Sequence, residues 1–542
     1  MKKVFYIIGV LLLLVSCNKL DLTPTDRLSD ADTWTDASLI RLYVNGTYAS
    51  VMMHGFQQDL LASACDEGYN IHDYGSLSVV QKGNLTSANV NGLSTKVNYF
   101  NYAYANLRDI NIFFEKIESA PVDDAFKNGT KGEMKFLRAY LYANLIWRYS
   151  SVPLITKVFD LHDDFAVSMT SYDDCVKFIV QELDEAAQLL PADQPAAQKG
   201  EASANACKAL KSRVLLYAAS ALNNPAHDNA KWQAAADAAQ DLLNAGYELN
   251  PDYQGLFLND NNEIIFSRSF TQANNTNFNL VQGRNGSDGY GSENPSQNMV
   301  NAYEMAATGK LPYIEQPDGS LLLTPGSGYD PANPYAGRDP RFEASILHDG
   351  SVWAGRETET FHGGKDAPES SNGFNASLTS YYYKKFLVES IPPSGSTTLP
   401  TNPWIFFRYA EILLNYAEAK FELGDEDACR QYLNMVRARQ SVNMPPVTDA
   451  GEALRSRIQN ERRVELAFEE HRFFDIRRWK IADETESKPL LGMNIQKADN
   501  GTKTYTITKV IDRAFYDQQY LMPFPSAEID KSQGSLIQNN GY

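Results

Sequence analysis

The sequence predicts a mainly α fold, in which tetratricopeptide-like helical hairpins form a scaffold that carries a large loop-rich, ligand-binding layer with short strands. Apolar residues recur at helical spacing in two blocks, about 35–246 and 404–542. Between them, at about 247–403, the helical period mostly disappears, and Gly, Asn, Ser, Pro and aromatic residues dominate. Because binding residues commonly lie on loops held by a rigid scaffold, we expect one domain, 35–542, with its ligand on the loops.

Residues 1–16 are typical of an export signal. Lys2 and Lys3 precede an apolar stretch, 4–15, which is too short to span a bilayer as a helix. Cys17 follows Ser16 in a pattern that resembles a bacterial lipobox, in which the cysteine is acylated before cleavage. We expect a signal peptide over 1–16, a lipid-anchored N-terminus at Cys17 and a polar tether over 17–34. The alternative is an ordinary secretory signal with an incidental cysteine.

Proline and glycine delimit the helices of the two blocks. Pro153 follows one helix, Pro191 closes the next and Gly246 ends another. Small alanines on paired segments allow close helix approach, which favours repeat-like hairpins over generic antiparallel pairs. The expected helices cover 35–51, 99–117, 132–149, 172–190, 205–222, 230–244, 404–423, 426–440 and 451–479, and short strands are expected at 263–266 and 381–387.

Composition narrows the class of partner. The chain has 542 residues, 43% of them hydrophobic, and a net charge of −18, which repels nucleic-acid phosphates. No second long apolar segment follows the signal, so we expect a tethered body that does not span the membrane. Four further cysteines lack the spacing of a metal or redox site and are expected to be buried free thiols rather than disulfides: Cys65, Cys175, Cys207 and Cys429.

Charged motifs near the C-terminus favour structure over catalysis. Glu461, Glu465 and Glu469 alternate with arginines at three- or four-residue spacing, which predicts an ion-paired or solvated face. His471 has no second histidine four residues later, so the zinc-hydrolase helix pattern is absent. The glycine-rich segment 283–291 follows no clear strand and is interpreted as an exposed loop rather than a nucleotide site. The sequence predicts no cofactor and leaves a structural calcium ion open.

Six segments, in order along nearly the whole chain, resemble the SusD/RagB family of outer-membrane glycan-binding lipoproteins. No one of them is decisive, but their number and order make chance agreement improbable. They are NKLDLTPTDRLSDADTW, KGEMKFLRAYLYANLIWRYSSVPLIT, NPYAGRDPRFEASIL, FRYAEILLNYAEAKFELG with LNMVRARQ, IQNERRVELAFEEHRFFDIRRWK, and YLMPFPSAEIDKSQGSLIQNNGY.

The resemblance implies several properties. It implies tetratricopeptide-like helix pairs beneath a loop-rich ligand face, and exposure at the surface of the outer membrane. It also implies capture of oligosaccharides without chemistry, for import through a SusC-like TonB-dependent transporter partner. The family's ligand residues vary among members, so the resemblance implies a region rather than individual positions.

Sugar binding requires flat aromatic faces together with polar side chains for the hydroxyl groups. Trp353 lacks helical neighbours and is expected to be an exposed stacking platform, although any single loop aromatic could equally anchor its own loop. The loops offer Glu67, Tyr69, Asn70, Asp73, Asn285 and Arg356 as further candidates. The predicted glycan-binding residues are Asp66, Tyr74, Asn98, Tyr99, Arg284, Tyr290 and Trp353.

Two other functions remain open at this point. A surface glycoside hydrolase would need two loop carboxylates in one cleft, for example Asp66 or Glu67 with Asp366. A helical-hairpin scaffold also suits capture of peptide or another nutrient.

Overall fold

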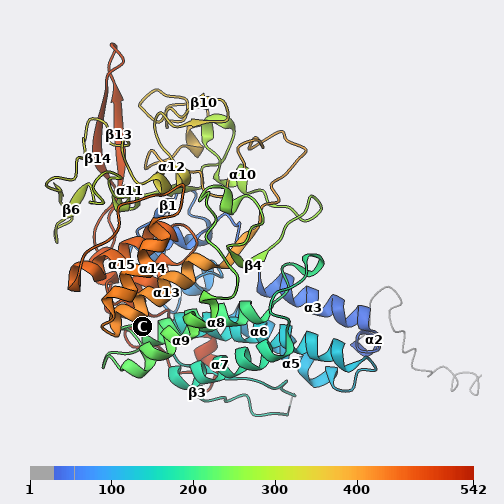
Figure 1. The fold of residues 1–542 in the computed structure, drawn as a ribbon. Coiled ribbons are helices and arrows are strands. Elements are labelled where there is room, and N and C mark those ends of the chain that lie inside the picture. Colours follow the sequence, from blue (N-terminus) through green and yellow to red (C-terminus); the bar gives the residue numbers. More distant parts are fainter. Residues whose placement is uncertain (1–29, 54, 161) are drawn as a thin grey trace, which may run out of the picture.

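Figure 1 shows the computed structural model, which describes residues 30–53, 55–160 and 162–542. Most helices gather in one half of the molecule, and the middle of the chain forms a loop-rich layer on the other side (Figure 1). The expected signal peptide, Cys17 and the first part of the tether, 17–29, lie outside the described residues. No described helix combines the length and apolar character needed to cross a membrane.

The scaffold is a row of helices in which each packs against the next. The row runs α5, α6, α7, α8, α9, and then continues directly into α13 and α14. The row contains α5 (Phe100–Ile117), α6 (Asp124–Tyr149), α7 (Tyr172–Leu189), α8 (Ala204–Ala219), α9 (Asn229–Leu243), α13 (Tyr409–Glu422) and α14 (Glu426–Arg437). The remaining helices are α2 (Asp30–Thr33), α3 (Ala37–Val51), α4 (Ser78–Gln81), α10 (Phe278–Gln282), α11 (Gln297–Ala302), α12 (Pro340–Ser345), α15 (Gly451–Glu465), α16 (Arg472–Arg478), α17 (Ala482–Thr485) and α18 (Ser526–Lys531).

Local sequence explains where these helices begin. Asp123, Ser171 and Ser203 accept hydrogen bonds from backbone N–H groups at the starts of α6, α7 and α8. Their apolar and alanine faces then pack into one large core. The predicted mainly α fold with helical hairpins is therefore confirmed, and the buried free thiols are confirmed as well: Cys65, Cys175, Cys207 and Cys429.

Among the residues that the structure describes, the strands form seven separate antiparallel pairs rather than one sheet. Two of these pairs join segments that are distant in sequence, because β1 pairs with β5 and β4 pairs with β12. The pairs are β1 (Gly68–Asn70) with β5 (Glu293–Pro295), β2 (Val152–Pro153) with β3 (Met169–Thr170), β4 (Ile264–Arg268) with β12 (Trp404–Arg408), β6 (Tyr313–Glu315) with β7 (Leu321–Leu323), β8 (Ile346–Leu347) with β11 (Tyr382–Tyr383), β9 (Val352–Trp353) with β10 (Arg356–Glu357), and β13 (Leu490–Lys497) with β14 (Lys503–Ile511).

Two expected helices are each divided in the structure. The expected helix 404–423 begins instead as strand β12, whose aromatic and β-branched residues pair with β4 before α13 starts. The expected helix 451–479 is broken between α15 and α16, where Phe468 and Glu470 adopt positive φ. Arg408 and Lys385 bind the carbonyl groups of Glu465 and Ala467 at this break, so these carbonyls are satisfied outside a helix.

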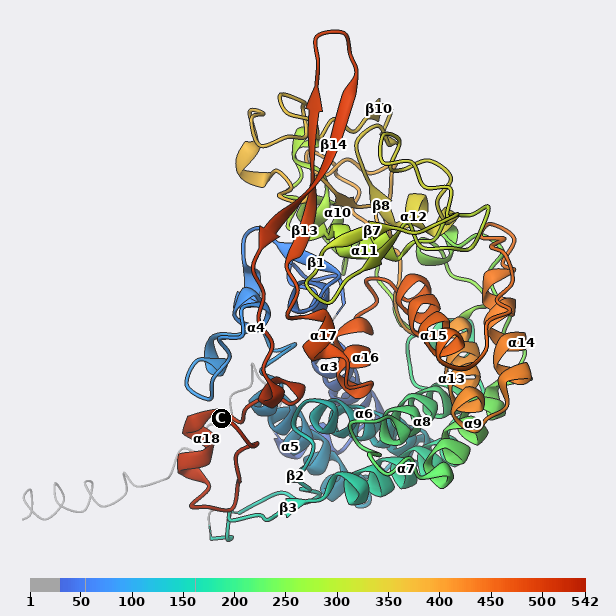
Figure 2. The same cartoon turned by 90° about the vertical axis from the view of Figure 1, so that its left-hand side faces the viewer.

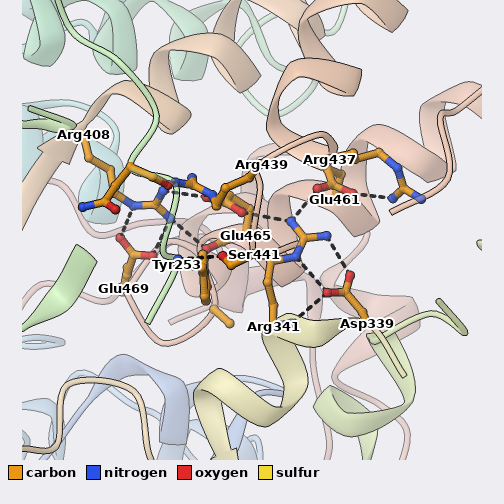
Figure 3. Close-up of polar contacts among 12 residues, drawn as sticks. Tyr253, Asp339, Arg341, Arg408, Arg437, Arg439, Ser441, Glu461, Glu465 and Glu469 are labelled. Atoms are coloured by element: carbon orange, nitrogen blue, oxygen red, sulfur yellow. Dashed lines mark hydrogen bonds and ion pairs between the residues drawn. The ribbon is translucent and has the colours of Figure 1, made fainter. Parts of the chain in front are cut away.

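A buried ion-pair network joins the scaffold to the loop layer (Figure 3). Glu465 of α15 accepts hydrogen bonds from Arg408 at 2.7 Å, from Arg439 at 2.7 Å and from Arg341 at 2.9 Å. Arg341 belongs to α12 in the loop layer and also contacts Glu461 of α15 at 2.5 Å. All five side chains are buried, so the network fastens α12, α15 and the end of β12 to one another.

The network keeps its carboxylates charged inside the protein. Burial alone would raise the pKa of Glu465, but Arg439, Arg408 and Arg341 hold it well below its usual range. The predicted ion-paired reading of these helical charges is confirmed, whereas a solvated face is wrong. The arginines reach across from other elements instead of pairing only along their own helix.

Replacing Arg408 by methionine tests how much of the fold this network supports. Glu263, Glu465 and Glu469 would lose a shared cation while staying buried. We expect the free energy of unfolding to fall by about 3–5 kcal/mol in guanidinium denaturation. The matched control is Lys177→Met, which breaks the exposed pair with Asp174 and should leave the denaturation midpoint unchanged. Similar midpoints for both variants would contradict this role.

Candidate functional site

Two loops of the loop layer meet because β1 pairs with β5. The register sets Asn70 opposite Glu293, and the backbone N–H of Ile71 donates to the carbonyl of Ser292 at 2.9 Å. The loop that follows β1 therefore lies beside the loop that precedes β5. The loop after β1 lies within the first helical block of the sequence, 35–246, and the loop before β5 lies in the loop-rich region 247–403.

Three aromatic side chains, those of His72, Tyr74 and Phe374, gather where these loops meet, and Tyr290 joins them through its main chain; we call these four residues the aromatic cluster. The His72 ring lies 5.3 Å from the Tyr74 ring and 5.1 Å from the Phe374 ring, between centroids. His72 Nε2 also lies 3.1 Å from the carbonyl oxygen of Tyr290. His72 thus connects the other three members.

The aromatic cluster offers apolar surface to solvent. Phe374 is 84% exposed, the highest value among the large hydrophobic side chains of the described residues, and Tyr290 is 36% exposed. His72 and Tyr74 are half-buried. An aromatic ring held open to water on a folded surface is typical of a binding site.

A carboxylate and an amide beneath the aromatic cluster fix the His72–Tyr74 loop. The side-chain oxygen of Asn70 accepts from the backbone N–H groups of His72 at 3.1 Å and Tyr74 at 3.3 Å. Its amide group donates to Glu293 at 3.0 Å, and Glu293 also accepts from the backbone N–H of Leu60 at 2.8 Å. These hydrogen bonds leave the loop little freedom before a ligand arrives, which lowers the entropy cost of binding.

The Phe374 turn, Gly373–Asn375, is fastened to the loop before β5 in the same way. Asn285 and Asn372 each donate from the side-chain amide to the other's carbonyl, both at 3.1 Å. Gly291 has φ of +51° and approaches so closely that a Cβ atom there would lie 2.6 Å from the carbonyl oxygen of Asn375. Only glycine permits this approach without strain.

Two of the seven predicted glycan-binding residues, Tyr74 and Tyr290, belong to the aromatic cluster. Their role as ligand contacts stays a prediction. Asn98 is half-buried just before α5, and its side-chain oxygen is buried. Tyr99 is buried at the same helix start and stacks against the guanidinium of Arg148 at 4.7 Å. No described contact joins Asn98 or Tyr99 to the cluster.

The expectation that Trp353 is an exposed platform is wrong. It is 7% exposed, and its carbonyl oxygen accepts from Arg284 at 2.6 Å. Arg284 is also buried and donates to Thr358 at 2.7 Å, while burial lowers its pKa to about 10. Arg284 and Trp353 therefore contact each other as a loop anchor, because a large aromatic side chain in a loop stabilises it best when buried.

The carboxylates considered for hydrolysis are occupied by ion pairs or enclosed. Asp66 is buried between Arg463 and Arg472, which overcome the effect of burial and hold its pKa below its usual range. Asp366 is buried, and its two carboxylate oxygens accept hydrogen bonds from the two terminal guanidinium nitrogens of Arg356, each at 2.7 Å. Asp66 is thus not an open ligand contact as predicted, and this pair of carboxylates lacks the exposed cleft that a glycosidase requires.

Glu67 differs because it lies buried without a cationic partner of its own. Burial, and then the neighbouring charge of Asp66, raise its pKa to about 8. It accepts a hydrogen bond from the backbone N–H of Phe468 at 3.3 Å, which ties β1 to the break after α15. Within the described residues, no group of three or more His, Cys, Asp or Glu side chains is arranged to hold a metal ion.

Sequence reasoning missed His72 and Phe374. Phe374 lies in SSNGFNAS, where the neighbouring Asn and Gly residues signal a turn that could expose an aromatic ring. His72 carries no such signal, because its position depends on the pairing of β1 with β5 across more than two hundred residues. The segment 283–291 is only partly the exposed loop expected, since Arg284 and Asn285 are buried within it.

Replacing Glu293 by glutamine tests the support beneath the aromatic cluster. Burial raises the pKa of Glu293 to about 7, so the folded protein keeps a proton that the unfolded chain releases near its usual value of 4.5. The resulting stability is present below pH ~4.5 and is lost as pH rises to about 7. In denaturation experiments, the free energy of unfolding of the wild type should fall by up to about 3 kcal/mol between pH 5 and pH 8, and this fall should be absent in the variant. The exposed Glu452→Gln is the control, and parallel pH profiles for wild type and Glu293→Gln would contradict the assignment.

Replacing Gly291 by alanine tests the close approach of the Phe374 turn. We expect the free energy of unfolding to fall by about 1–3 kcal/mol, because alanine meets both a positive φ and the carbonyl of Asn375. Gly501→Ala is the matched control, since Gly501 has φ of +85° but open space around it. Thermal denaturation should show the larger loss at Gly291, and equal losses would show that the approach is unimportant.

Comparison with known proteins agrees with this architecture. The chain matches the SusD family over residues 262–542, and a second family, described as starch-binding and associating with the outer membrane, over residues 26–216. It is 24% identical to SusD-like protein P2 of Formosa agariphila, over all of this chain and 99% of that protein. A SusD-like protein from Bacteroides fragilis is 29% identical with a TM-score of 0.78, over 96% of this chain and 100% of that chain. A SusD-like carbohydrate binding protein from the same species is 25% identical with a TM-score of 0.77, over 92% and 98%. The chain therefore belongs to the SusD family.

Proposed function

We propose that this protein captures oligosaccharides with the aromatic cluster and delivers them to a TonB-dependent outer-membrane transporter for import. One observation carries the proposal, namely that Phe374 and Tyr290 hold aromatic surface open to solvent on fixed loops. The C–H face of a sugar ring packs on such rings, and this contact needs no charge on the ligand.

Polar groups beside the rings suit the hydroxyl groups of a sugar. Asn372 and Asn375 lie in or next to the Phe374 turn and are partly exposed, and Asn375 donates to Asn372 at 3.0 Å. Their amides both donate and accept hydrogen bonds, as hydroxyl groups require. A few polar groups next to an aromatic surface would orient the sugar while stacking holds it.

Relatives support the class of ligand. One similar structure is named as a carbohydrate binding protein, and another SusD-like protein as laminarin binding. The family description that matches residues 26–216 names starch binding and association with the outer membrane. We extend carbohydrate binding to this chain as a class rather than to a particular polysaccharide.

The proposal includes a lipid anchor at Cys17 and a role without catalysis. Acylation at Cys17 would hold the protein at the membrane, where a transporter partner lies within reach of the captured glycan. A non-catalytic role agrees with the ion pairs that occupy Asp66 and Asp366. The partner transporter and the surface location remain part of the proposal.

Replacing Phe374 by alanine tests the proposal directly. With maltohexaose and laminarihexaose as probes in calorimetry, we expect affinity for the bound glycan to fall about tenfold, because a stacking face is lost. The melting temperature should stay unchanged, since the ring is exposed. Ile537→Ala, which removes another exposed apolar side chain, is the matched control and should bind normally.

Two results would contradict the proposal. Cleavage of either hexasaccharide by repurified protein would indicate a hydrolase. Binding of unstructured peptides, with no binding of glycans, would favour the peptide-capture alternative.

A further inference from the structure

A second aromatic surface lies beside the β13–β14 hairpin, away from the aromatic cluster. Tyr313 of β6, Tyr329 and Tyr505 of β14 line a groove of about 450 Å³, which we call the tyrosine groove. This volume is within the range of about 300–1,000 Å³ that is typical of small-molecule sites. The groove shares no lining residue with the aromatic cluster. In Figure 2, β7 lies to the right of the hairpin, and α4, which follows the His72–Tyr74 loop, lies to its left.

The three tyrosine rings are held in place by packing behind them. Tyr313 and Tyr329 meet edge to face with centroids 5.1 Å apart. Arg338 backs Tyr329 at 5.4 Å and is itself fixed by the carbonyl of Tyr303. Tyr505 packs edge to face against Tyr335 at 5.6 Å. Rings fixed in this way lose little freedom when a ligand binds, so contact with them yields more affinity.

The chemistry of the lining restricts what the groove can hold. None of the described residues that line it carries a charge, which disfavours phosphates, carboxylates and metal ions. Met493 and Ile507 add apolar surface, and Thr506 adds a hydroxyl group. Burial and the neighbouring Tyr313 raise the pKa of Tyr329 above its usual value, and its hydroxyl group, like that of any tyrosine, is protonated at neutral pH. Hydroxyl groups at the rims of flat rings match the surface of a neutral sugar.

We propose that the tyrosine groove is a second binding site for a neutral oligosaccharide, separate from the aromatic cluster. The choice of a sugar rests on the proposed function, because the same rings could accept an extended apolar peptide. The aliphatic side chains most exposed on the β6–β7 hairpin lie outside the groove lining: Ile314, Leu322 and Leu323. Five aliphatic residues also line the groove, namely Leu321, Pro331, Leu491, Met493 and Ile507. Its three tyrosines and Thr506 add side-chain hydroxyl groups, which can bond the hydroxyl groups of a sugar and which an aliphatic peptide does not require.

The experiment uses the mature chain with Cys17→Ser, which stays unlipidated. Maltohexaose, laminarihexaose, cellohexaose, xylohexaose and mannohexaose are titrated by calorimetry, and the sugar that binds is kept. One variant disables the aromatic cluster with Phe374→Ala and Tyr290→Ala. Another disables the groove with Tyr313→Ala and Tyr505→Ala. Circular dichroism and melting temperature check that each variant is folded.

We expect two binding events in the parent chain. The cluster variant should keep one event, and adding Tyr505→Ala should weaken that event about tenfold or more. Tyr505→Phe keeps the ring and should weaken it less than about threefold, which separates stacking from loss of packing. If the double groove variant is destabilised, Tyr505→Ala alone replaces it, with binding read from the saturation-transfer signals of the sugar.

The outcomes separate the two proposals. Binding that disappears in the cluster variant and is unchanged in the groove variant overturns the groove and retains the proposed function. Binding that disappears only in the groove variant supports the groove and overturns the role of the aromatic cluster. No binding of any hexasaccharide overturns both, and binding of an apolar peptide in the groove overturns its assignment to sugar.

Discussion

The structure depends on one electrostatic constraint, the sharing of Glu465 among three buried arginines. Arg341 comes from the loop layer, Arg408 from the end of β12 and Arg439 from just after α14, and all three must reach the same carboxylate (Figure 3). A buried charge without partners is costly, so each arginine has few alternative positions. The layer that carries the aromatic rings is thereby held in one orientation on the helical scaffold, and the positions of its loops follow from that.

The candidate site shows how short elements can create a fixed surface. β1 and β5 have only three residues each, yet their pairing sets Asn70 against Glu293 and brings His72 next to Tyr290. Two hydrogen bonds between Asn285 and Asn372, each from a side-chain amide to the other residue's backbone carbonyl, hold the Phe374 turn beside these loops. The candidate surface is therefore an arrangement of loops, carried on the helices of the scaffold.

Most of the scaffold could be predicted from the sequence, because helices such as α7 and α9 follow local periodicity, caps and proline stops. The division of 451–479 could not, since it depends on Arg408 and Lys385 binding carbonyl groups from distant segments. The β13–β14 hairpin was missed although KTYTITKVI alternates in the manner of a strand. Tyr74 and Tyr290 were predicted as ligand contacts because they are loop aromatics, and that role stays a prediction. The expected exposure of Trp353 was wrong, because burial depends on packing that a single sequence does not reveal.

The direct packing of α9 against α13 has a consequence for how the chain folds and changes. Helices α5 to α9 can assemble from neighbouring contacts as they are synthesised, but the row gains α13 only after residues 244–408 have emerged. The free-energy cost of bringing the two ends of this long segment, 244–408, together grows only logarithmically with its length, by about 0.6 kcal/mol for each doubling. Length changes confined to exposed loops of this segment, away from buried anchors such as Arg341, therefore cost little loop-closure entropy and leave the helical row in place.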